Sequence, residues 1–279
     1  MKCDWDSLMA IVPPRLRTEV DNLGRESLEE LHLRIGQPVE LLLGGRSCLL
    51  QCNITSADIQ YVVNTASRYS PWASVTVAQG YITASGGHRI GLCGECVIQG
   101  GMVTGIRTVT SLCIRVARSF PGIGNNVPMN GSLLILGPPG TGKTTLLRDL
   151  IRLRSQGGTT IAVVDERGEL FPNGCIFDTG VRTDILTGCS KAQGVLMALK
   201  TMGPKCVAVD EITAYEDCQA LLSAGWCGVE LLATAHASDS GDFKRRPVYR
   251  PLAESGLFEY MVILGRDKSR RVERMELCT

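Results

Sequence analysis

The segment at residues 137–144, GPPGTGKT, has the spacing G-x-x-x-x-G-K-[ST], which is typical of a loop that binds nucleotide phosphates. Glycines let the backbone curl so that several N–H groups point at phosphate oxygens, and the following helix directs its positive N-terminal end at the same anion. Lys143 is expected to reach the β- and γ-phosphates, and the Thr144 hydroxyl to ligate Mg²⁺. The sequence therefore predicts a site for ATP and Mg²⁺. Its predicted binding residues are Gly137, Pro138, Pro139, Gly140, Thr141, Gly142, Lys143, Thr144 and Thr145.

Two apolar, strand-like runs each end in a pair of acidic residues. Asp165 and Glu166 end the run IAVVDE, and Asp210 and Glu211 end the run CVAVDE. Because parallel strands end at one edge of a sheet, beside the glycine-rich loop, both pairs can face the nucleotide. Asp210 is predicted to hold Mg²⁺ through its hydration shell, and Glu211 to polarise the water that attacks the γ-phosphorus. For Asp165 and Glu166 two interpretations stay open: acids of the same site, or solvated acids at a strand end that pair with Arg167.

A histidine, His236, closes another apolar run in LLATAHASDS. If that run is a strand of the same sheet, His236 lies at the same edge as the acid pairs. It is then either a residue that senses the bound nucleotide or a structural histidine with satisfied hydrogen bonds.

The second half of the chain alternates apolar strand-like runs with helical segments. Strands are predicted at 132–136, 160–164, 205–209, 229–234 and 258–264. This alternation favours an α/β fold with a mostly parallel sheet and helices on both faces. The predicted phosphate-loop domain spans residues 126–279, after the Pro-, Gly- and Asn-rich linker SFPGIGNNVPMNG.

The first half reads as a smaller α+β domain, residues 1–125. Residues 4–31 look helical around Pro13 and Pro14, and LHLRIGQPVELLL predicts two short strands around a Gln37-Pro38 turn. Thr55 is a predicted helix N-cap with Asp58 at the capping-box position. From Tyr81 to Val116, short β-rich runs broken by glycine pairs predict a hairpin meander.

Composition and charge limit the partners that the chain can be expected to have. The chain has 279 residues, 44% of them hydrophobic, and a net charge of +1, so its bulk charge gives no reason to expect nucleic acid or an anionic membrane. No run approaches the ~18 apolar residues that span a bilayer. The N-terminal MKCDWDSLMAIVPPRLR resembles neither a signal peptide nor an anchor.

The twelve cysteines are interpreted as reduced cytosolic thiols and not as a disulfide framework, since no export signal accompanies them. Cys93 and Cys96 in CGEC suggest zinc, but a structural zinc site needs two further ligands, usually a second close pair. None follows in the sequence, and a strand is the favoured interpretation.

Taken together, the motifs resemble a known family. The order of glycine-rich loop, acidic strand end, second acidic strand end and His-terminated strand is similar to that of the type II/type IV secretion ATPases, including pilus motors. More closely, both domains resemble the stage III sporulation AA family of endospore-forming bacteria. The segments that carry this resemblance are LHLRIGQPVEL, GYITASGGHRIGLCG, GPPGTGKTTLLRDLIR, VVDERGEL, GVRTDILTGCSKAQG, MGPKCVAVDEI and ATAHA.

The resemblance implies a RecA-like motor domain that works as a homo-oligomeric ring, expected to be a hexamer. It implies that the ring energises a membrane channel complex between mother cell and forespore, from the mother-cell cytoplasm and at the inner face of the membrane. It also implies that Asp165 belongs to the site, that Glu211 orients the water, and that His236 links nucleotide state to movement.

Phosphoryl transfer is faster when an arginine neutralises developing charge, often from a neighbouring subunit. Arg167 and Arg182 are expected near the site within the phosphate-loop domain. Among the arginines of the meander and linker, Arg107 and Arg115 are the favoured candidates to act on a neighbour's site, and the alternative is that each is a surface arginine. The remaining candidates are Arg89 and Arg118.

Two other functions stay open at this point. One is an ATP-binding switch or scaffold without productive turnover, which the intact Glu211 disfavours. The other is a RecA-like nucleic-acid motor, which the near-neutral charge disfavours. The basic tail GRDKSRRVERMELCT is interpreted as a charged turn and an edge strand, with a DNA contact as the alternative.

Overall fold

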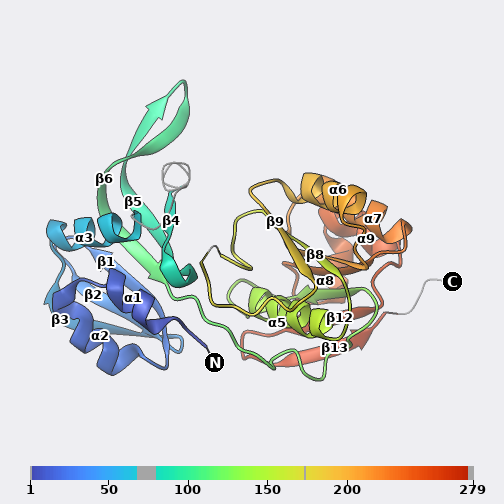
Figure 1. Cartoon of the computed structure of the whole chain (residues 1–279), viewed down its shortest axis with the longest axis horizontal. Coiled ribbons are helices and arrows are strands. Elements are labelled where there is room, and N and C mark those ends of the chain that lie inside the picture. The colour runs from blue at the N-terminus through green and yellow to red at the C-terminus, as the bar shows by residue number, and fades with distance from the viewer. Residues whose placement is uncertain (1, 68–79, 173, 276–279) are drawn as a thin grey trace. The chain divides into compact units, whose positions relative to one another are not determined.

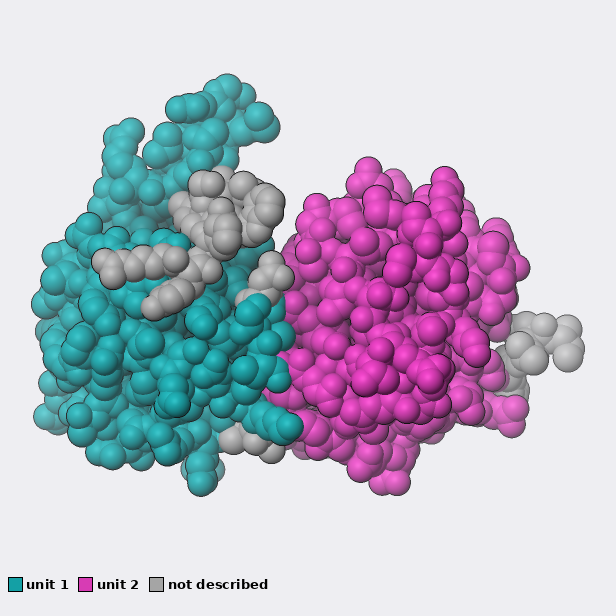
Figure 2. Space-filling model, in the orientation of Figure 1, with its two compact units in different colours: residues 1–118, 172–176 teal, residues 119–171, 177–279 magenta. Residues whose placement is uncertain are grey.

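A computed structural model describes residues 2–67, 80–172 and 174–275. The chain divides into two compact units, which Figure 2 colours separately. Unit 1 comprises Met1–Arg118 and Pro172–Ile176, and unit 2 comprises Ser119–Phe171 and Phe177–Thr279.

Unit 1 is built around a six-stranded antiparallel sheet with the strand order β3-β2-β1-β6-β5-β4. Two short helical turns, Pro14–Leu16 and Ser85–Gly87, accompany its helices. The helices and strands are α1 (Trp5–Ile11), α2 (Arg17–Gly24), α3 (Ser56–Ser67), β1 (Leu28–Arg34), β2 (Pro38–Leu43), β3 (Arg46–Asn53), β4 (Tyr81–Thr83), β5 (Arg89–Gln99) and β6 (Met102–Arg115).

One face of this sheet packs against the three helices of unit 1. Side chains of alternate residues, such as Leu31 and Leu33 of β1, join Leu8 of α1 and Val62 of α3 in one buried cluster. Because successive residues of a strand point to opposite faces, the residues between them lie on the other face of the sheet.

The predicted capping box at the start of α3 is confirmed. The Thr55 N–H donates to Asp58 Oδ2 over 2.8 Å, and the Asp58 N–H donates to Thr55 Oγ1 over 3.3 Å. Arg15 also pairs with the Asp58 carboxylate, which ties the end of the first helical region to α3.

Unit 2 is built around a seven-stranded sheet with the order β13-β12-β7-β11-β10-β8-β9, in which only β13 runs antiparallel. Figure 1 labels β8, β9, β12 and β13 of this sheet. Its strands are β7 (Leu133–Leu136), β8 (Ile161–Asp165), β9 (Thr183–Thr187), β10 (Cys206–Ile212), β11 (Glu230–Ala235), β12 (Tyr260–Leu264) and β13 (Arg270–Arg274). Its helices are α5 (Lys143–Gln156), α6 (Lys191–Thr201), α7 (Tyr215–Trp226), α8 (Ser240–Arg245) and α9 (Arg250–Glu254), with a short turn at Pro247–Tyr249.

Helices cover both faces of the parallel sheet. Leu134 and Val164 belong to a buried cluster with Val195 of α6 and Leu221 of α7, so these two helices share one face. Helix α5 contacts β7, β10 and β11, and its buried Leu147 lies outside that cluster, on the other face. The predicted α/β class with a mostly parallel, two-sided sheet is therefore confirmed.

The predicted strands of unit 2 are confirmed to within two residues at their starts, and the predicted edge strand in the basic tail is β13. The prediction that helix extends to residue 31 is wrong, because α2 ends at Gly24 and β1 begins at Leu28. Alternate burial of Leu31 and Leu33 fits a half-buried strand and not a helix face. Strands β3 and β9 were not predicted.

Candidate active site

The glycine-rich loop connects β7 to α5 at the carboxyl edge of the parallel sheet. Gly140 (φ 77°) and Gly142 (φ 94°) adopt left-handed backbone conformations that L side chains rarely take. Helix α5 then begins at Lys143, with Gly142 as its N-cap. The Thr141 hydroxyl donates to the Pro138 carbonyl over 2.9 Å, which closes the loop on itself. Loop and helix start together present backbone N–H groups and a helix dipole to an anion.

The Lys143 ammonium is buried at the centre of this loop. Nζ donates to the carbonyl oxygens of Gly137 and Pro138, each over 2.9 Å, and to His236 Nδ1 over 3.1 Å. Burial lowers the pKa of Lys143, and the charges of Asp210 and Glu211 oppose that shift.

His236 follows β11 and connects Lys143 to Glu211. Because an ammonium can only donate, Nδ1 of His236 accepts, and the imidazole proton of the neutral ring lies on Nε2. Nε2 donates to Glu211 Oε1 over 2.8 Å. Glu211 itself has a left-handed φ of 55°, and its N–H donates to Thr234 Oγ1 over 2.8 Å. Glu211, near the end of β10, thus combines a strained backbone conformation with a side chain that reaches His236.

Asp210 joins the glycine-rich loop to the neighbouring strands. Thr144 Oγ1 donates to its Oδ2 over 2.7 Å, and Thr234 Oγ1 donates to its Oδ1 over 2.6 Å. Burial raises the pKa of Asp210, and the two hydroxyl donors oppose the shift. Hydroxyl and carboxylate oxygens at this separation are the donor set that Mg²⁺ prefers.

Asp165, at the end of β8, holds the loop that follows it. Its Oδ1 accepts from the Glu169 N–H over 2.8 Å, and its Oδ2 accepts from the N–H groups of Leu170 and Phe171, each over 2.9 Å. Burial raises the pKa of Asp165 against these three donors. Arg148 of α5 donates to the Glu169 and Leu170 carbonyls of the same loop.

Glu166 pairs with a lysine that the sequence had not singled out. Lys191 Nζ lies 2.5 Å from Glu166 Oε2 and 3.8 Å from Asp217 Oδ2, and the lysine side chain is only 9% exposed. Lys191 is the first residue of α6, so this ion pair joins the end of β8 to that helix.

The two acid pairs line one hollow that is open to solvent. Five carboxylate residues surround it against two cations, so the hollow has the charge balance that suits a bound cation. The lining residues are Val164, Asp165, Glu166, Arg167, Glu169, Lys191, Asp210, Glu211 and Thr213. The structure thus brings Lys143, Thr144, Asp210, Glu211 and His236 together through short contacts at one sheet edge. Asp165 and Glu166 line the same hollow as Asp210 and Glu211.

Of the two arginines expected near the site within unit 2, the structure places one there and one elsewhere. Arg167 lines the hollow. The expectation that Arg182 lies near the site is wrong: its carbonyl accepts from the N–H of Ile161, at the start of β8, whereas the site lies where β8 ends. In unit 1, Arg107 pairs with Glu95 at 3.2 Å and Arg115 with Glu30 at 3.3 Å.

Thr234 is the site residue that the sequence reasoning missed. Its hydroxyl donates to the Asp210 carboxylate and accepts from the Glu211 backbone N–H. Thr234 therefore positions the Asp210 side chain and the Glu211 backbone. The available signal was a polar threonine within the apolar run LLATA, which the structure buries completely.

Comparison with solved structures identifies the fold. The pilus retraction motor PilT with bound ADP superposes with a TM-score of 0.62 at 15% identity, over 92% of this chain and 80% of that chain. The ATPase DotB of Legionella pneumophila superposes with a TM-score of 0.57 at 17% identity, over 93% and 78%. The fold is therefore the RecA-like α/β fold of secretion ATPases.

Sequence comparison gives the family within that class. Residues 6–274 match the family described as Sporulation stage III, protein AA. The Stage III sporulation protein AA of Bacillus subtilis (strain 168) is 35% identical over 94% of this chain and 92% of its own length. The chain belongs to this family. The uncharacterized protein ycf45 of Cyanidium caldarium is 29% identical over 60% of this chain and 53% of its own length.

Across residues 2–67, 80–172 and 174–275, no helix is both long and apolar enough to span a bilayer.

Proposed function

We propose that the protein hydrolyses ATP with Mg²⁺, as an oligomeric motor of the secretion-ATPase type that energises or assembles a membrane channel complex during endospore formation. The observation that carries the proposal is the 2.7 Å contact between Thr144 and Asp210, beside the hydrogen-bond chain from Lys143 through His236 to Glu211. The residues proposed to hold Mg²⁺, to bind phosphate and to orient water therefore lie where β7, β10 and β11 end.

Each residue of this group has chemistry suited to one task. Lys143 and the loop N–H groups bind phosphate oxygens, and Thr144 with Asp210 holds Mg²⁺, which neutralises charge on the phosphates when bound. Glu211 orients the attacking water, and His236 holds the Glu211 carboxylate in place. Thr145, the next residue of α5, completes the predicted set of binding residues.

Asp165 and Glu166 receive positioning roles in this proposal. Both carboxylate oxygens of Asp165 accept hydrogen bonds from backbone N–H groups of residues 169–171. Asp165 thereby holds in place the loop that forms one wall of the hollow. Glu166 holds Lys191, which brings a positive charge to the same wall. Their effect on hydrolysis is through the shape and charge of the hollow.

A neighbouring subunit is proposed to complete the site in a homo-oligomeric ring, with six subunits as the expected size. The candidate arginines, Arg107 and Arg115, are 68% and 66% exposed. Arg107 is preferred because its partner Glu95 is also 58% exposed, and ion pairs in water are worth only ~0–1 kcal/mol. Arg107 can therefore exchange Glu95 for an anionic ligand at little cost.

The proposed partners are proteins of the sporulation membrane complex, and the proposed place is the mother-cell cytoplasm at the membrane face. The support is membership of a family whose relative in Bacillus subtilis is named for sporulation stage III. Nucleic acid is not a proposed partner, since the net charge is +1.

Phosphate release with Mg²⁺ and ATP tests the proposed reaction. Wild type, Glu211→Gln and the exposed control Glu254→Gln are compared, after the mass of each in solution has been measured with and without a non-hydrolysable ATP analogue. The proposal requires a ring in the presence of the analogue and at least ~100-fold slower release by Glu211→Gln only. Equal, measurable rates for wild type and Glu211→Gln would overturn the role of Glu211, and ATP binding by wild type without phosphate release would instead support an ATP-binding switch.

A further inference from the structure

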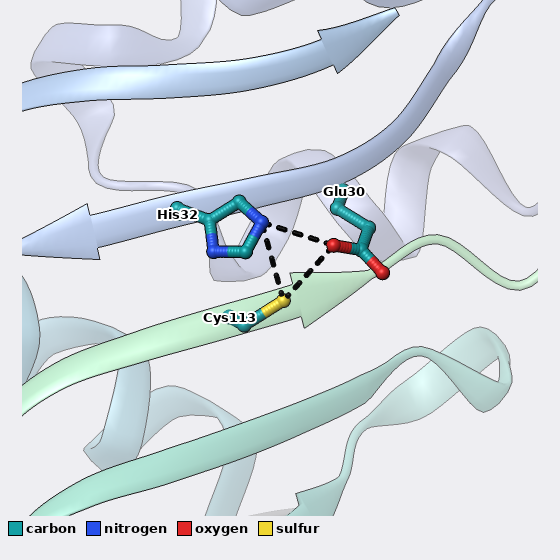
Figure 3. A group of neighbouring side chains, drawn as sticks. All are labelled: Glu30, His32 and Cys113. Atoms are coloured by element: carbon teal, nitrogen blue, oxygen red, sulfur yellow. Dashed lines mark hydrogen bonds and ion pairs between the residues drawn. The ribbon is translucent and has the colours of Figure 1, made fainter. Parts of the chain in front are cut away.

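Three residues of unit 1 with metal-binding side chains lie together on its sheet, as Figure 3 shows: Glu30, His32 and Cys113. His32 Nε2 lies 2.9 Å from Glu30 Oε2. Cys113 Sγ lies 3.7 Å from the same carboxylate oxygen and 3.8 Å from His32 Nε2. Among the described residues, no other group of three or more His, Cys, Asp and Glu side chains meets this spacing.

The strand register explains why these side chains meet. Glu30 and His32 are two residues apart on β1, and His32 pairs directly with Cys113 on the adjacent antiparallel strand β6. Their neighbours Leu31, Leu112 and Ile114 belong to the buried cluster, so the three polar side chains lie on the face opposite the helices.

The distances are close to those of a tetrahedral zinc site. With bonds of about 2.3 Å to sulfur and about 2.1 Å to nitrogen and oxygen, a tetrahedral ion separates sulfur from either lighter ligand by about 3.6 Å, and nitrogen from oxygen by about 3.4 Å. The sulfur distances of 3.7 and 3.8 Å already match. The 2.9 Å contact between His32 and Glu30 must open by roughly half an ångström, which a small rotation of the Glu30 side chain supplies.

We propose that Glu30, His32 and Cys113 form a binding site for a borderline-soft divalent cation, Zn²⁺, with water as the fourth ligand. One thiolate, one imidazole and one carboxylate suit Zn²⁺ better than the hard cation Mg²⁺, which prefers oxygen alone. The site is distinct from the oxygen donors of unit 2.

The surroundings of the cluster fit such an ion. Arg115 Nε lies 3.3 Å from the other carboxylate oxygen, Glu30 Oε1, and so helps to orient the Glu30 side chain. On the second neighbouring strand of β6, which is β5, Gly91 pairs with Cys113. Apart from the chain neighbours of Gly91, the one atom of the described residues within 4 Å of where its Cβ would stand is the Cys113 carbonyl oxygen, at 3.9 Å. His32 and Glu30 are 25% and 27% exposed, which admits a water ligand from solvent.

Binding replaces the thiol proton of Cys113 with the metal, and the proton passes to the buffer. No oxidant or reductant takes part in this exchange.

The expected consequence is a cross-link between β1 and β6, whose ligands lie 83 positions apart in the chain. A ligand that binds only the folded state stabilises it, and at about a hundredfold excess over Kd the midpoint temperature of unit 1 is expected to rise by roughly 5–10 °C. The site therefore acts as a metal-dependent clamp on the sheet.

The test uses Co²⁺ as the spectroscopic substitute for Zn²⁺, on the full chain freed of metal and kept in excess Mg²⁺. Wild type is expected to bind one Co²⁺ with a thiolate-to-cobalt charge-transfer band, to release one proton per metal, and to lose the band when Zn²⁺ is added. Cys113→Ser and His32→Gln are each expected to abolish the band and to weaken Zn²⁺ binding more than about a hundredfold. The double variant Cys93→Ser/Cys96→Ser is the matched thiol control and is expected to behave as wild type.

The proposal is overturned if the band survives in Cys113→Ser, if it disappears in the Cys93→Ser/Cys96→Ser control, or if folded wild type binds no Co²⁺. In the last case the cluster is only a hydrogen-bonded trio. His32→Gln keeps every thiol, so a band lost in this variant reports the loss of the site and not the loss of a thiol. Circular dichroism checks that each variant remains folded.

Discussion

His236 Nε2 donates a hydrogen bond to Glu211 Oε1 over 2.8 Å while the other ring nitrogen accepts from Lys143. The imidazole therefore couples the lysine proposed to bind phosphate to the acid proposed to orient water. Movement of the Lys143 ammonium toward a phosphate changes one end of this chain, and the Glu211 carboxylate is at the other end. The proposed function therefore includes a sensing role for His236, which responds to bound nucleotide.

The first prediction concerns this chain. His236→Ala removes the group that orients Glu211, so we expect kcat for ATP hydrolysis to fall by roughly 10–100-fold, with a smaller change in KM. His236→Gln is the conservative control, because its carbonyl can accept from Lys143 and its amide can donate to Glu211. Steady-state phosphate release on assembled protein measures both. If Gln and Ala variants lose the same activity, the hydrogen-bond coupling is not what His236 contributes.

The second prediction is that the ionised Asp210 side chain lowers the free energy of unfolding, although the proposed hydrolysis requires it. Burial raises its pKa, so the ionised side chain destabilises the fold at pH values above that pKa, and the penalty disappears as the pH falls and the acid is protonated. Asp210→Asn should raise the free energy of unfolding by about 1 kcal/mol at neutral pH, and the gain should vanish toward acidic pH. The same variant should hydrolyse ATP at least ~100-fold more slowly.

Urea titrations of unit 2 at neutral and acidic pH measure the stability difference, and phosphate release measures the activity. Thr213→Ser, which leaves every contact of Asp210 in place, serves as the control. An Asp210→Asn protein less stable than wild type at neutral pH would show that the two threonine hydroxyls outweigh the burial penalty.

Much of unit 2 could be predicted because its signals are local. The glycine-rich loop is a contiguous motif, and β7, β8 and β10 are continuous apolar runs that end where polar residues begin. Their acidic ends converge because parallel strands share one carboxyl edge, which is a rule of topology and needs no coordinates.

The remainder depends on contacts that the sequence does not encode locally. Strand β9, with the sequence TDILT, has two polar residues that face water at the sheet edge, so it carries no apolar run. The position of Arg182 follows from the pairing of Ile161 with Thr183, and that register is tertiary. The segment Pro172–Ile176 belongs to unit 1, although the chain on both sides of it belongs to unit 2.

Asp165 shows the same limit for function. A pattern of strand and acid predicts where the carboxylate lies, but not that both of its oxygens are occupied by backbone N–H groups. Those donors belong to residues four to six positions later, in a loop whose path only the folded chain defines.

The third prediction follows from these three bonds. Asp165→Ala leaves the N–H groups of Glu169, Leu170 and Phe171 without their acceptor, and we expect a loss of about 3 kcal/mol in the free energy of unfolding. Arg167→Ala, an exposed change two residues away, should cost less than about 0.5 kcal/mol. Urea unfolding measures both, and hydrogen exchange should show lost protection at residues 169–171 first. Equal stability of the two variants would contradict the structural role of Asp165.

The last prediction concerns acid sensitivity of unit 1 at His88. The ring is fully buried, its Nε2 donates to the Asp4 carbonyl over 2.9 Å, and its Nδ1 accepts from the Ala117 N–H over 3.1 Å. Burial lowers the pKa of His88 below its ordinary value of 6.5, since a second ring proton would be buried and would face the Ala117 N–H. The stability that this lowered pKa contributes is complete above pH 6.5 and is lost as the pH falls through the folded-state pKa.

We therefore expect the free energy of unfolding of unit 1 to decline as the pH falls below 6.5. His88→Gln can still donate to the Asp4 carbonyl; we expect this variant to be less stable than wild type at neutral pH but to lose less of its stability on acidification. A second decline belongs to Asp58, because Arg15 lowers the pKa of that carboxyl to about 2 and its contribution is lost only as the pH falls below 3.8. Hydrogen exchange of peptides from α1, followed at increasing urea concentration, isolates unit 1 from unit 2. If wild type and His88→Gln lose stability equally between pH 6.5 and pH 3.8, another group is responsible for the acid sensitivity.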